Sequence, residues 1–341
     1  MNKMRVLLTG SQGYIGTVLS SMLKQKLYSV VSYDTGFYKE NLTGNFEEND
    51  ETIEKDIRDF EIKDFQNVDV IIHLAALSND PVGEFSPSLT QDINYNATKK
   101  IANLAKEAGV KRFIYSSSQS MYGIADLSKE LDEDDSDKKP VTAYAKAKWD
   151  AELYLNTLNS SNFSVVCFRP STVFGASPRL RTDVVFNNLV ACAFTTGVIE
   201  IKSDGSPWRP IVHVRDVCSA FIAGIEAPDY LVAGQAFNIG IRGGNYTVKQ
   251  IAEAAQRAVP NSKLIFTNEH TDPRTYKVSF DRILNDLKDY YKPEWDLTKG
   301  GYELVKFFEK IGFTEKQFKS RDTIRLKQLQ YLTETNKINS E

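Results

Sequence analysis

From residue 4 to about residue 170, short apolar runs alternate with amphipathic stretches. The runs that predict strands are 6–8, 28–33, 68–76, 112–116 and 163–168, and 52–54 predicts a weak short strand. Helical spacing of apolar residues follows at 15–23, 86–108 and 142–159. Because strands that alternate with helices pair in parallel through right-handed crossovers, the pattern predicts an α/β fold with a doubly wound parallel sheet.

After residue 170 the apolar pattern breaks into shorter elements, which predict a smaller α/β lobe over the edge of the sheet. We expect the main domain at 1–170, with returns near 211–240. The lobe and a C-terminal tail would then occupy 171–210 and 241–341. The last stretch, 314–341, is predicted as a charged helix and tail, and we assign no chemistry to it.

The loop after the first strand carries glycines at positions 10, 13 and 16, directly before the first helical pattern. Gly10 permits a tight turn, Gly13 lets a pyrophosphate approach the backbone, and Gly16 allows close packing of helix on sheet. The free N–H groups at the helix start would face the phosphates. The second strand ends in Asp34, which suits the ribose hydroxyls of NAD and repels a 2′-phosphate. The loop therefore predicts a Rossmann-type NAD site, the alternative being a glycine-rich turn in an ordinary α/β protein.

Charge and hydropathy argue against several other classes of function. The net charge is −3, so we expect neither nucleic acid nor an anionic membrane as a partner. No apolar run approaches the ~20 residues of a membrane span, and the first strand leaves no space for a signal peptide. The three cysteines lie in apolar surroundings, as expected for free thiols in a reducing cytoplasm. The three histidines are scattered, so we expect no metal site.

Tyr144 and Lys148 are four residues apart on a predicted helix and therefore share one face. A phenol has a pKa near 10, but a neighbouring ammonium and a bound cationic nicotinamide favour the phenolate. Lowering this pKa by ~3 units takes about 4 kcal/mol, which two nearby positive charges in a partly dry site can supply. Ser118 ends the preceding strand, where its hydroxyl would hold the oxygen that Tyr144 deprotonates. A surface Tyr–Lys pair without chemistry is the alternative reading.

Further motifs extend this pattern along the chain. They are L-T-G-S-Q-G-Y-I-G at 8–16, Asp34, 56–57, H-L-A-A at 73–76, Asn94, 116–118, 121–123, Tyr144, Lys148, F-R-P at 168–170, V-F-G at 173–175, N-N-L at 187–189, W-R-P-I-V-H-V at 208–214, Asp216 and D-P-R at 272–274. With them the chain resembles, from residue 3 to about residue 285, the extended short-chain dehydrogenase/reductases that act on nucleotide sugars.

The resemblance implies a role for each matching position. Toward NAD, it implies Gly10, Gly13, Tyr14, Ile15 and Gly16 at the pyrophosphate, Asp34 at the adenosine ribose, Asp56 and Ile57 at the adenine, and Leu74, Ala75 and Ala76 along the cofactor. It also implies Lys148 at the nicotinamide ribose, Tyr144 as a further cofactor-binding residue, and Asn94 ordering the helix and water chain behind the active site. Toward a nucleotide-diphosphate sugar, it implies Asn188, Arg209 and Arg274 at the diphosphate and Ser118 and Thr172 at the sugar. Guanidinium groups match phosphate oxygens.

The resemblance also implies the reaction. Tyr144 would take the proton of the sugar C4 hydroxyl while hydride passes from C4 to NAD, giving a 4-keto sugar. Reduction on the other face makes a 4-epimerase, release makes a 4-dehydrogenase, and the reverse direction makes a 4-ketoreductase. We expect the 4-epimerase, because NAD suits a closed redox cycle and the stretches 116–123 and 187–189 are most like 4-epimerases. The nucleoside stays open among UDP, GDP, dTDP and CDP.

Two other activities are disfavoured. Members that eliminate water carry an Asp-Glu pair just after the catalytic Ser or Thr, whereas this chain has Gln119 and Ser120, so a 4,6-dehydratase would lack its acid and base. A non-catalytic dinucleotide sensor typically loses the Tyr or the Lys, and both are present.

The resemblance further implies a homodimer, and we also expect a cytoplasmic location and a role in polysaccharide biosynthesis. The dimer would use helices 86–108 and 142–159. Their apolar positions are consistent with a four-helix interface or with ordinary core, and they include Ile101, Leu104, Trp149, Leu153 and Leu155.

Overall fold

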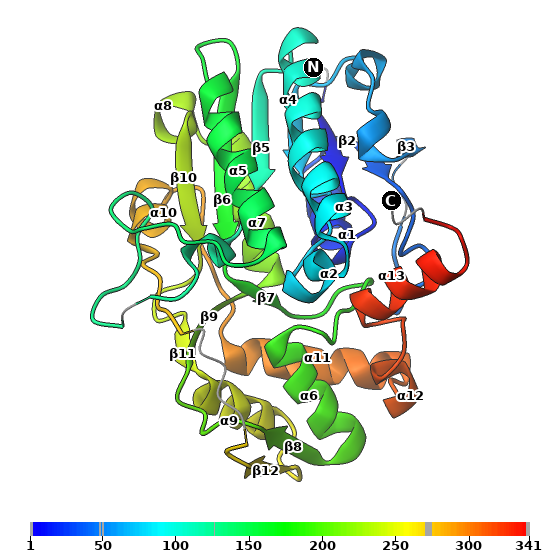
Figure 1. Ribbon diagram of the computed structural model, residues 1–341, viewed down its shortest axis with the longest axis vertical. Coiled ribbons are helices and arrows are strands. Elements are labelled where there is room, and N and C mark those ends of the chain that lie inside the picture. Colours follow the sequence, from blue (N-terminus) through cyan, green and yellow to red (C-terminus); the bar gives the residue numbers. More distant parts are fainter. Residues whose placement is uncertain (1–2, 48, 50, 126, 270–274, 339–341) are drawn as a thin grey trace.

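The computed structural model describes residues 3–47, 49, 51–125, 127–269 and 275–338. At its centre is a seven-stranded sheet with the order β10-β6-β5-β4-β1-β2-β3, in which every neighbouring pair is parallel (Figure 1). The bounds are β1 (Arg5–Thr9), β2 (Ser29–Asp34), β3 (Glu51–Glu54), β4 (Val70–His73), β5 (Arg112–Ser116), β6 (Ser164–Pro170) and β10 (Gln235–Ile239). The strand order reverses its direction between β1 and β4, which is where open α/β sheets bind ligands.

Helices cover both faces of the sheet. Val6 and Leu8 of β1 belong to the core shared with one helical layer, whereas Leu7 belongs to the core shared with the other. Successive side chains of a strand point to opposite faces, so a strand buried on both sides reads as a continuous apolar run. The first layer contains α1 (Tyr14–Gln25) and α7 (Val214–Glu226), and the second contains α2 (Asp80–Phe85), α3 (Pro87–Gln91), α4 (Thr98–Glu107) and α5 (Ala143–Leu158). The predicted doubly wound fold is confirmed.

The predicted helix at 86–108 is not one regular helix. It consists of α3, a π-helical segment at Asp92–Ala97, and α4. Within that segment the Asn94 side chain accepts a hydrogen bond from the Leu77 N–H at 2.8 Å and donates to the Leu77 carbonyl at 3.0 Å. π-Helical insertions commonly mark functional sites. Here the insertion coincides with the residue that holds the loop after β4.

Two of the positions considered for a dimer interface are core residues. Ile101 and Leu155 are fully buried between the second helical layer and the sheet. Leu104 and Trp149 are partly buried against the two cores, and Leu153 is 47% exposed. Leu153 is thus the clearest of the five as an outward-facing apolar position.

Most of the remaining elements pack below the sheet in the view of Figure 1, around a core of their own. They form a three-stranded sheet, β11-β9-β7, and a two-stranded sheet, β12-β8, with helices beside them. The bounds of these elements are β7 (Thr172–Phe174), α6 (Val185–Thr196), β8 (Val198–Ile201), β9 (Trp208–His213), β11 (Asn245–Thr247), α9 (Val248–Ala258), β12 (Lys263–Phe266), α11 (Leu297–Ile311) and α12 (Glu315–Phe318). Two short helices, α8 (Asp229–Val232) and α10 (Asp281–Asp286), instead contact β10 of the main sheet, and the last helix is α13 (Arg325–Glu334). The exact domain boundaries stay a prediction.

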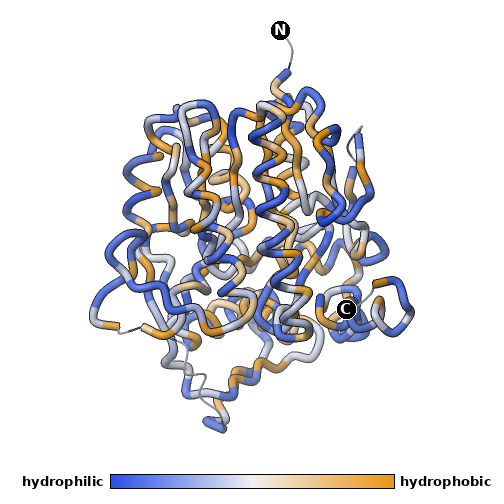
Figure 2. Tube along the Cα trace, turned by 45° about the horizontal axis from the view of Figure 1, so that its top comes forward, coloured by the Kyte–Doolittle hydropathy of each residue, from blue (hydrophilic) through white to orange (hydrophobic). Residues whose placement is uncertain are grey.

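The end of the chain returns to the main sheet layer. Helix α13 contacts α2, and its Leu329 and Leu332 are buried in the same core as Leu7 (Figure 1). Figure 2 shows hydrophobic and hydrophilic positions alternating along the helices, the pattern of helices with one buried face. In the described part of the chain, no helix combines the length and the apolar character that a membrane span needs.

Candidate active site

A cavity of about 340 Å³ lies at the carboxyl ends of the central strands. Many predicted site residues line it together, namely Gly10, Gly13, Tyr14, Ile15, Gly16, Asp34, Asp56, Ile57, Leu74, Ala75, Ala76, Ser118, Tyr144, Lys148 and Thr172. They come from the loops after β1, β2, β3, β4 and β5, from the start of α5 and from β7. Parallel strands end at one edge of the sheet, which explains why residues so far apart in sequence meet there.

Two glycines at the turn from β1 into α1, Gly10 and Gly16, have no space for a side chain. Gly10 has a φ of +70°, and a Cβ there would lie 2.8 Å from the Ala75 nitrogen. A Cβ on Gly16 would lie 2.1 Å from the Gly10 carbonyl oxygen. No side chain caps the start of α1, and its first turn holds no acidic residue. This cradle therefore suits the pyrophosphate of a dinucleotide, which the helix N-terminus attracts.

Asp34 is buried at the end of β2, beside the glycine loop. Its two carboxylate oxygens accept hydrogen bonds from the backbone N–H groups of Gln12 at 3.0 Å and Gly36 at 2.9 Å. Burial raises the pKa of Asp34, and these two hydrogen bonds act in the opposite direction. The amides fix the carboxylate at the cavity wall, as a ribose-binding residue requires.

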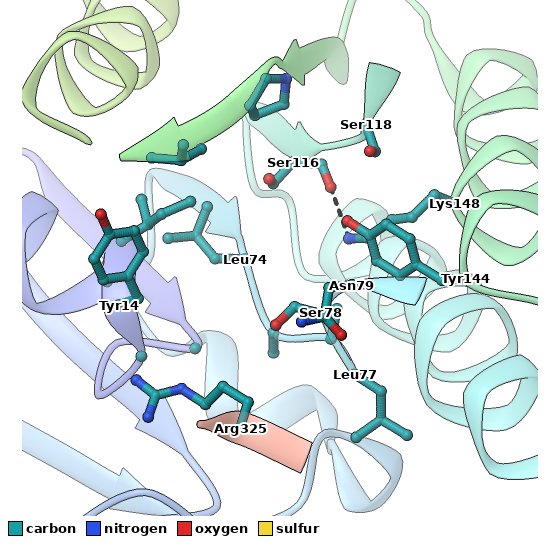
Figure 3. A pocket seen from close by; sticks show the side chains of 18 of the residues that line it. Tyr14, Leu74, Leu77, Ser78, Asn79, Ser116, Ser118, Tyr144, Lys148 and Arg325 are labelled. Carbon is teal, nitrogen blue, oxygen red and sulfur yellow. Dashed lines mark hydrogen bonds between the residues drawn. The ribbon is translucent and has the colours of Figure 1, made fainter. Parts of the chain in front are cut away.

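Ser118, Tyr144 and Lys148 lie together at the other end of the cavity (Figure 3). Thr142 accepts a hydrogen bond from the Ala145 N–H and so starts α5, which places Tyr144 and Lys148 one turn apart. Lys148 is buried, and its ammonium donates to the Ser116 carbonyl at 2.7 Å. Ser118 follows β5, and its hydroxyl donates to the Ser120 hydroxyl at 3.0 Å.

Several neighbouring groups act on the pKa of Tyr144. Burial raises the pKa of Tyr144, the hydrogen bond with Ser118 lowers it, the charge of Asp80 raises it and that of Arg181 lowers it. Arg181, which the sequence analysis did not name, is thus one cation that favours the phenolate. Burial also lowers the pKa of Lys148 from 10.5 to about 7.

Helix α2 holds the start of α5 in place. A Cβ on Gly83 would lie 2.8 Å from the Tyr144 Cβ, so the two helices touch at this glycine. The Thr142 hydroxyl donates to the Asp80 carboxylate at 2.7 Å. The small residue and this hydrogen bond together fix where the Tyr144 ring enters the cavity.

Three predicted residues that the structure describes, Asn94, Asn188 and Arg209, do not line the cavity. Asn94 braces Leu77 from behind the wall. The Asn188 side chain donates to the Thr182 carbonyl at 2.9 Å, and Arg209 donates to the Trp208 carbonyl at 2.8 Å. Arg274 lies outside the described residues. Their roles toward the cofactor or the diphosphate stay predictions.

The cavity also contains polar residues that the sequence reasoning missed, among them Asn79, Asp80, Arg181 and Arg325. Asn79 has a φ of +85°, accepts a hydrogen bond from the Val82 N–H and donates to Asp183 at 3.1 Å. Such backbone strain concentrates at functional sites. In the sequence, the only indication of Arg181 is its position two residues before Asp183, with which it forms an ion pair in the structure. No local signal marks Arg325, at the start of α13. Among the residues that the structure describes, no three His, Cys, Asp or Glu side chains could hold a metal ion together.

Comparison with known proteins identifies relatives that cover most of the chain. A family model described as the NAD dependent epimerase/dehydratase family matches residues 6–240. The chain is 29% identical to a UDP-glucose 4-epimerase of Mycolicibacterium smegmatis over 319 residues, which cover 89% of this chain and 98% of the relative. It is 27% identical to a dTDP-D-glucose 4,6-dehydratase of Mus musculus over 304 residues, covering 85% of this chain and 81% of the relative.

Solved structures share the fold. The UDP-glucose 4-epimerase of Thermotoga maritima superimposes with a TM-score of 0.78 at 23% identity, covering 90% of this chain and 99% of that one. An NAD-dependent NDP-hexosamine 5,6-dehydratase of tunicamycin biosynthesis gives a TM-score of 0.79 at 20% identity, with coverage of 90% and 98%. These similarities extend past residue 240, beyond the reach of the family model.

Proposed function

Because the chain belongs to the NAD-dependent epimerase/dehydratase family, as an NAD-dependent enzyme of the extended short-chain dehydrogenase/reductase type, we propose that it is a nucleotide-sugar 4-epimerase. The observation that carries the proposal is one cavity lined by the glycine loop at one end and by Ser118, Tyr144 and Lys148 at the other. Relatives named as 4-epimerases and as 4,6-dehydratases act on nucleotide sugars, which supports this substrate class.

The protein side chains would move the proton of the sugar C4 hydroxyl. Bound NAD supplies reversible hydride acceptance at C4. Tyr144, as phenolate, takes the hydroxyl proton, and Ser118 shares the hydrogen bond to the same oxygen. Arg181 lowers the pKa of Tyr144, and the Lys148 ammonium sits one helical turn away, on the carbonyl of Ser116. Once the 4-keto sugar has rotated to present its opposite face, Tyr144 would return the proton to the C4 oxygen while the hydride is returned to that face of C4, which restores NAD and completes the epimerisation.

The residues after Ser118 argue against dehydration. Elimination of water needs a carboxylic acid and a carboxylate near the sugar. Neither residue that follows Ser118 is a carboxylic acid. The Gln119 amide donates a hydrogen bond to the Arg169 carbonyl at 3.0 Å, and the Ser120 hydroxyl accepts one from the Ser118 hydroxyl. The Asp80 carboxylate lies in the cavity wall, but it accepts a hydrogen bond from the Thr142 hydroxyl. One such group does not supply both an acid and a base.

The test is a panel of UDP-, dTDP-, GDP- and CDP-hexoses incubated with the enzyme in deuterated water. Inversion at C4 without solvent deuterium and without net NADH absorbance supports the 4-epimerase. Stoichiometric NADH would indicate a 4-dehydrogenase, and reduction of a supplied 4-keto sugar would indicate a 4-ketoreductase. Deuterium at C5 with loss of the C6 hydroxyl would refute the argument from Gln119 and Ser120. The Tyr144→Phe variant is the control.

We further propose a homodimer formed through α4 and α5, a cytoplasmic location and a role in polysaccharide biosynthesis. Leu153 on α5, at 47% exposure, is the apolar position that supports the interface. The free thiols of Cys167, Cys192 and Cys218 suit a reducing compartment. Light scattering should give twice the chain mass at micromolar concentration, and a monomer would contradict the interface.

A further inference from the structure

The side chain of Arg325 brings a buried charge from the C-terminal helix to the cavity wall. The residue is only 2% exposed. Its Nη2 donates to the Arg179 carbonyl at 2.8 Å, and its guanidinium carbon lies 4.4 Å from the centroid of the Tyr38 ring. Its Nη1 is buried and has no hydrogen-bond partner in the protein. A buried charged donor without a partner is unfavourable, so its presence at a cavity wall indicates a ligand group that completes it.

Helix α13 is fastened to the segments that border the cofactor end of the cavity. The Gln328 amide donates to the Phe37 carbonyl at 2.8 Å, in the segment that follows β2. The Asn41 amide donates to the Arg321 carbonyl at 3.0 Å, just before α13. On its other side the helix buries Leu329 in the sheet core. Arg325 is therefore held in position by both polar and apolar contacts.

Positive charge is concentrated around this position. Arg181 forms a two-point ion pair with Asp183, at 2.8 and 3.0 Å, so that carboxylate is already occupied. Burial lowers the pKa of Arg325 to about 10. The charges of Arg181 and Arg179 act in the same direction, and those of Tyr38 and Asp183 act in the opposite one. An anion between the guanidinium groups would relieve this repulsion.

We propose that Arg325 binds a phosphate of the NAD pyrophosphate, which makes the C-terminal helix α13 a part of the dinucleotide site. Figure 3 shows the Arg325 side chain reaching from α13 toward the side of the cavity where Tyr14 lies, away from Tyr144 and Lys148. Tyr14 opens α1, whose uncapped N-terminus attracts the same anion. Helix α13 lies outside residues 6–240, to which the family model extends. The inference concerns the dinucleotide alone and holds whichever sugar the enzyme uses.

The test compares Arg325→Gln, Arg325→Lys and the control Lys327→Gln, an exposed lysine on the same helix. The full-length protein, freed of nucleotide, is titrated calorimetrically with NAD, ADP-ribose and adenosine. Loss of one charge-assisted hydrogen bond should weaken NAD and ADP-ribose about tenfold to a hundredfold in Arg325→Gln, with partial recovery in Arg325→Lys. Adenosine, which lacks phosphate, should bind all variants alike, and NAD should leave Arg325→Gln correspondingly faster in displacement experiments.

Three results would overturn the proposal. Unchanged ADP-ribose affinity in Arg325→Gln would mean that the guanidinium touches no cofactor phosphate. An equal loss for adenosine would show that Arg325 only supports the shape of the site. A loss confined to UDP, titrated in parallel, would assign Arg325 to the substrate diphosphate. Thermal unfolding without ligand identifies a variant that fails to fold, and Arg325→Lys then provides the comparison.

Discussion

The buried ammonium of Lys148 should make the stability of the ligand-free enzyme depend on pH in a way that one substitution removes. Burial lowers the pKa of Lys148 from 10.5 to about 7, and the side chain is only 3% exposed. Between these values the unfolded chain holds the proton that the folded chain releases. Since the unfolded state then binds more protons, the free energy of unfolding rises with pH across this window, and the penalty of burying the charge is complete below about pH 7.

The magnitude follows from this pKa difference. Each pH unit inside the window contributes up to about 1.4 kcal/mol, so Lys148 alone should add about 2 kcal/mol to the free energy of unfolding between about pH 7 and about pH 9. In Lys148→Met this increment disappears. The variant also leaves the Ser116 carbonyl without its donor, which costs roughly 1–3 kcal/mol, but this loss is the same at both pH values and cancels in the comparison.

The assay is urea unfolding of wild type, Lys148→Met and the control Lys146→Met at both pH values. Lys146 is an exposed lysine of the same helix, and its variant should follow the wild type. All other titrating groups are shared, so the difference between the pH increments isolates Lys148. Wild type should gain about 2 kcal/mol more than Lys148→Met. Parallel profiles, within about 0.5 kcal/mol, would refute a strongly lowered pKa at this position.

The remaining predictions concern Tyr144 and its surroundings. Tyr144→Phe should lower turnover about 10²- to 10⁴-fold while NAD affinity, measured by calorimetry, stays within about twofold; retained turnover would contradict its role as the base. Because the charge of Asp80 raises the pKa of Tyr144, Asp80→Asn should move the rise of kcat/KM with pH to lower pH, and a shift to higher pH would reverse the assigned sign. Gly83→Ala places a Cβ 2.8 Å from that of Tyr144, so the free energy of unfolding should fall by about 1–3 kcal/mol; an unchanged urea midpoint would show that α2 and α5 can separate.

The sequence alone determined the fold class, the family and NAD as the cofactor. These depend on short-range patterns. The apolar run of β1, the three glycines and the acid that ends β2 lie within 34 residues, and each has a local physical reason. Tyr144 and Lys148 are one helical turn apart, so their common face followed from spacing. Ser118 was placed by the end of its strand, since parallel strands end at one edge.

Only the tertiary structure decided which distant side chains join that site. The sequence assigned no chemistry to the last stretch of the chain, yet packing of Leu329 into the sheet core brings Arg325 into the cavity wall. Likewise, the tertiary structure adds Arg181 as a cation whose charge lowers the pKa of Tyr144. Ile101 is core rather than interface because the sheet lies against that face of α4. Such contacts join segments up to hundreds of residues apart, and they arise from burial of whole helix faces, which no local spacing encodes.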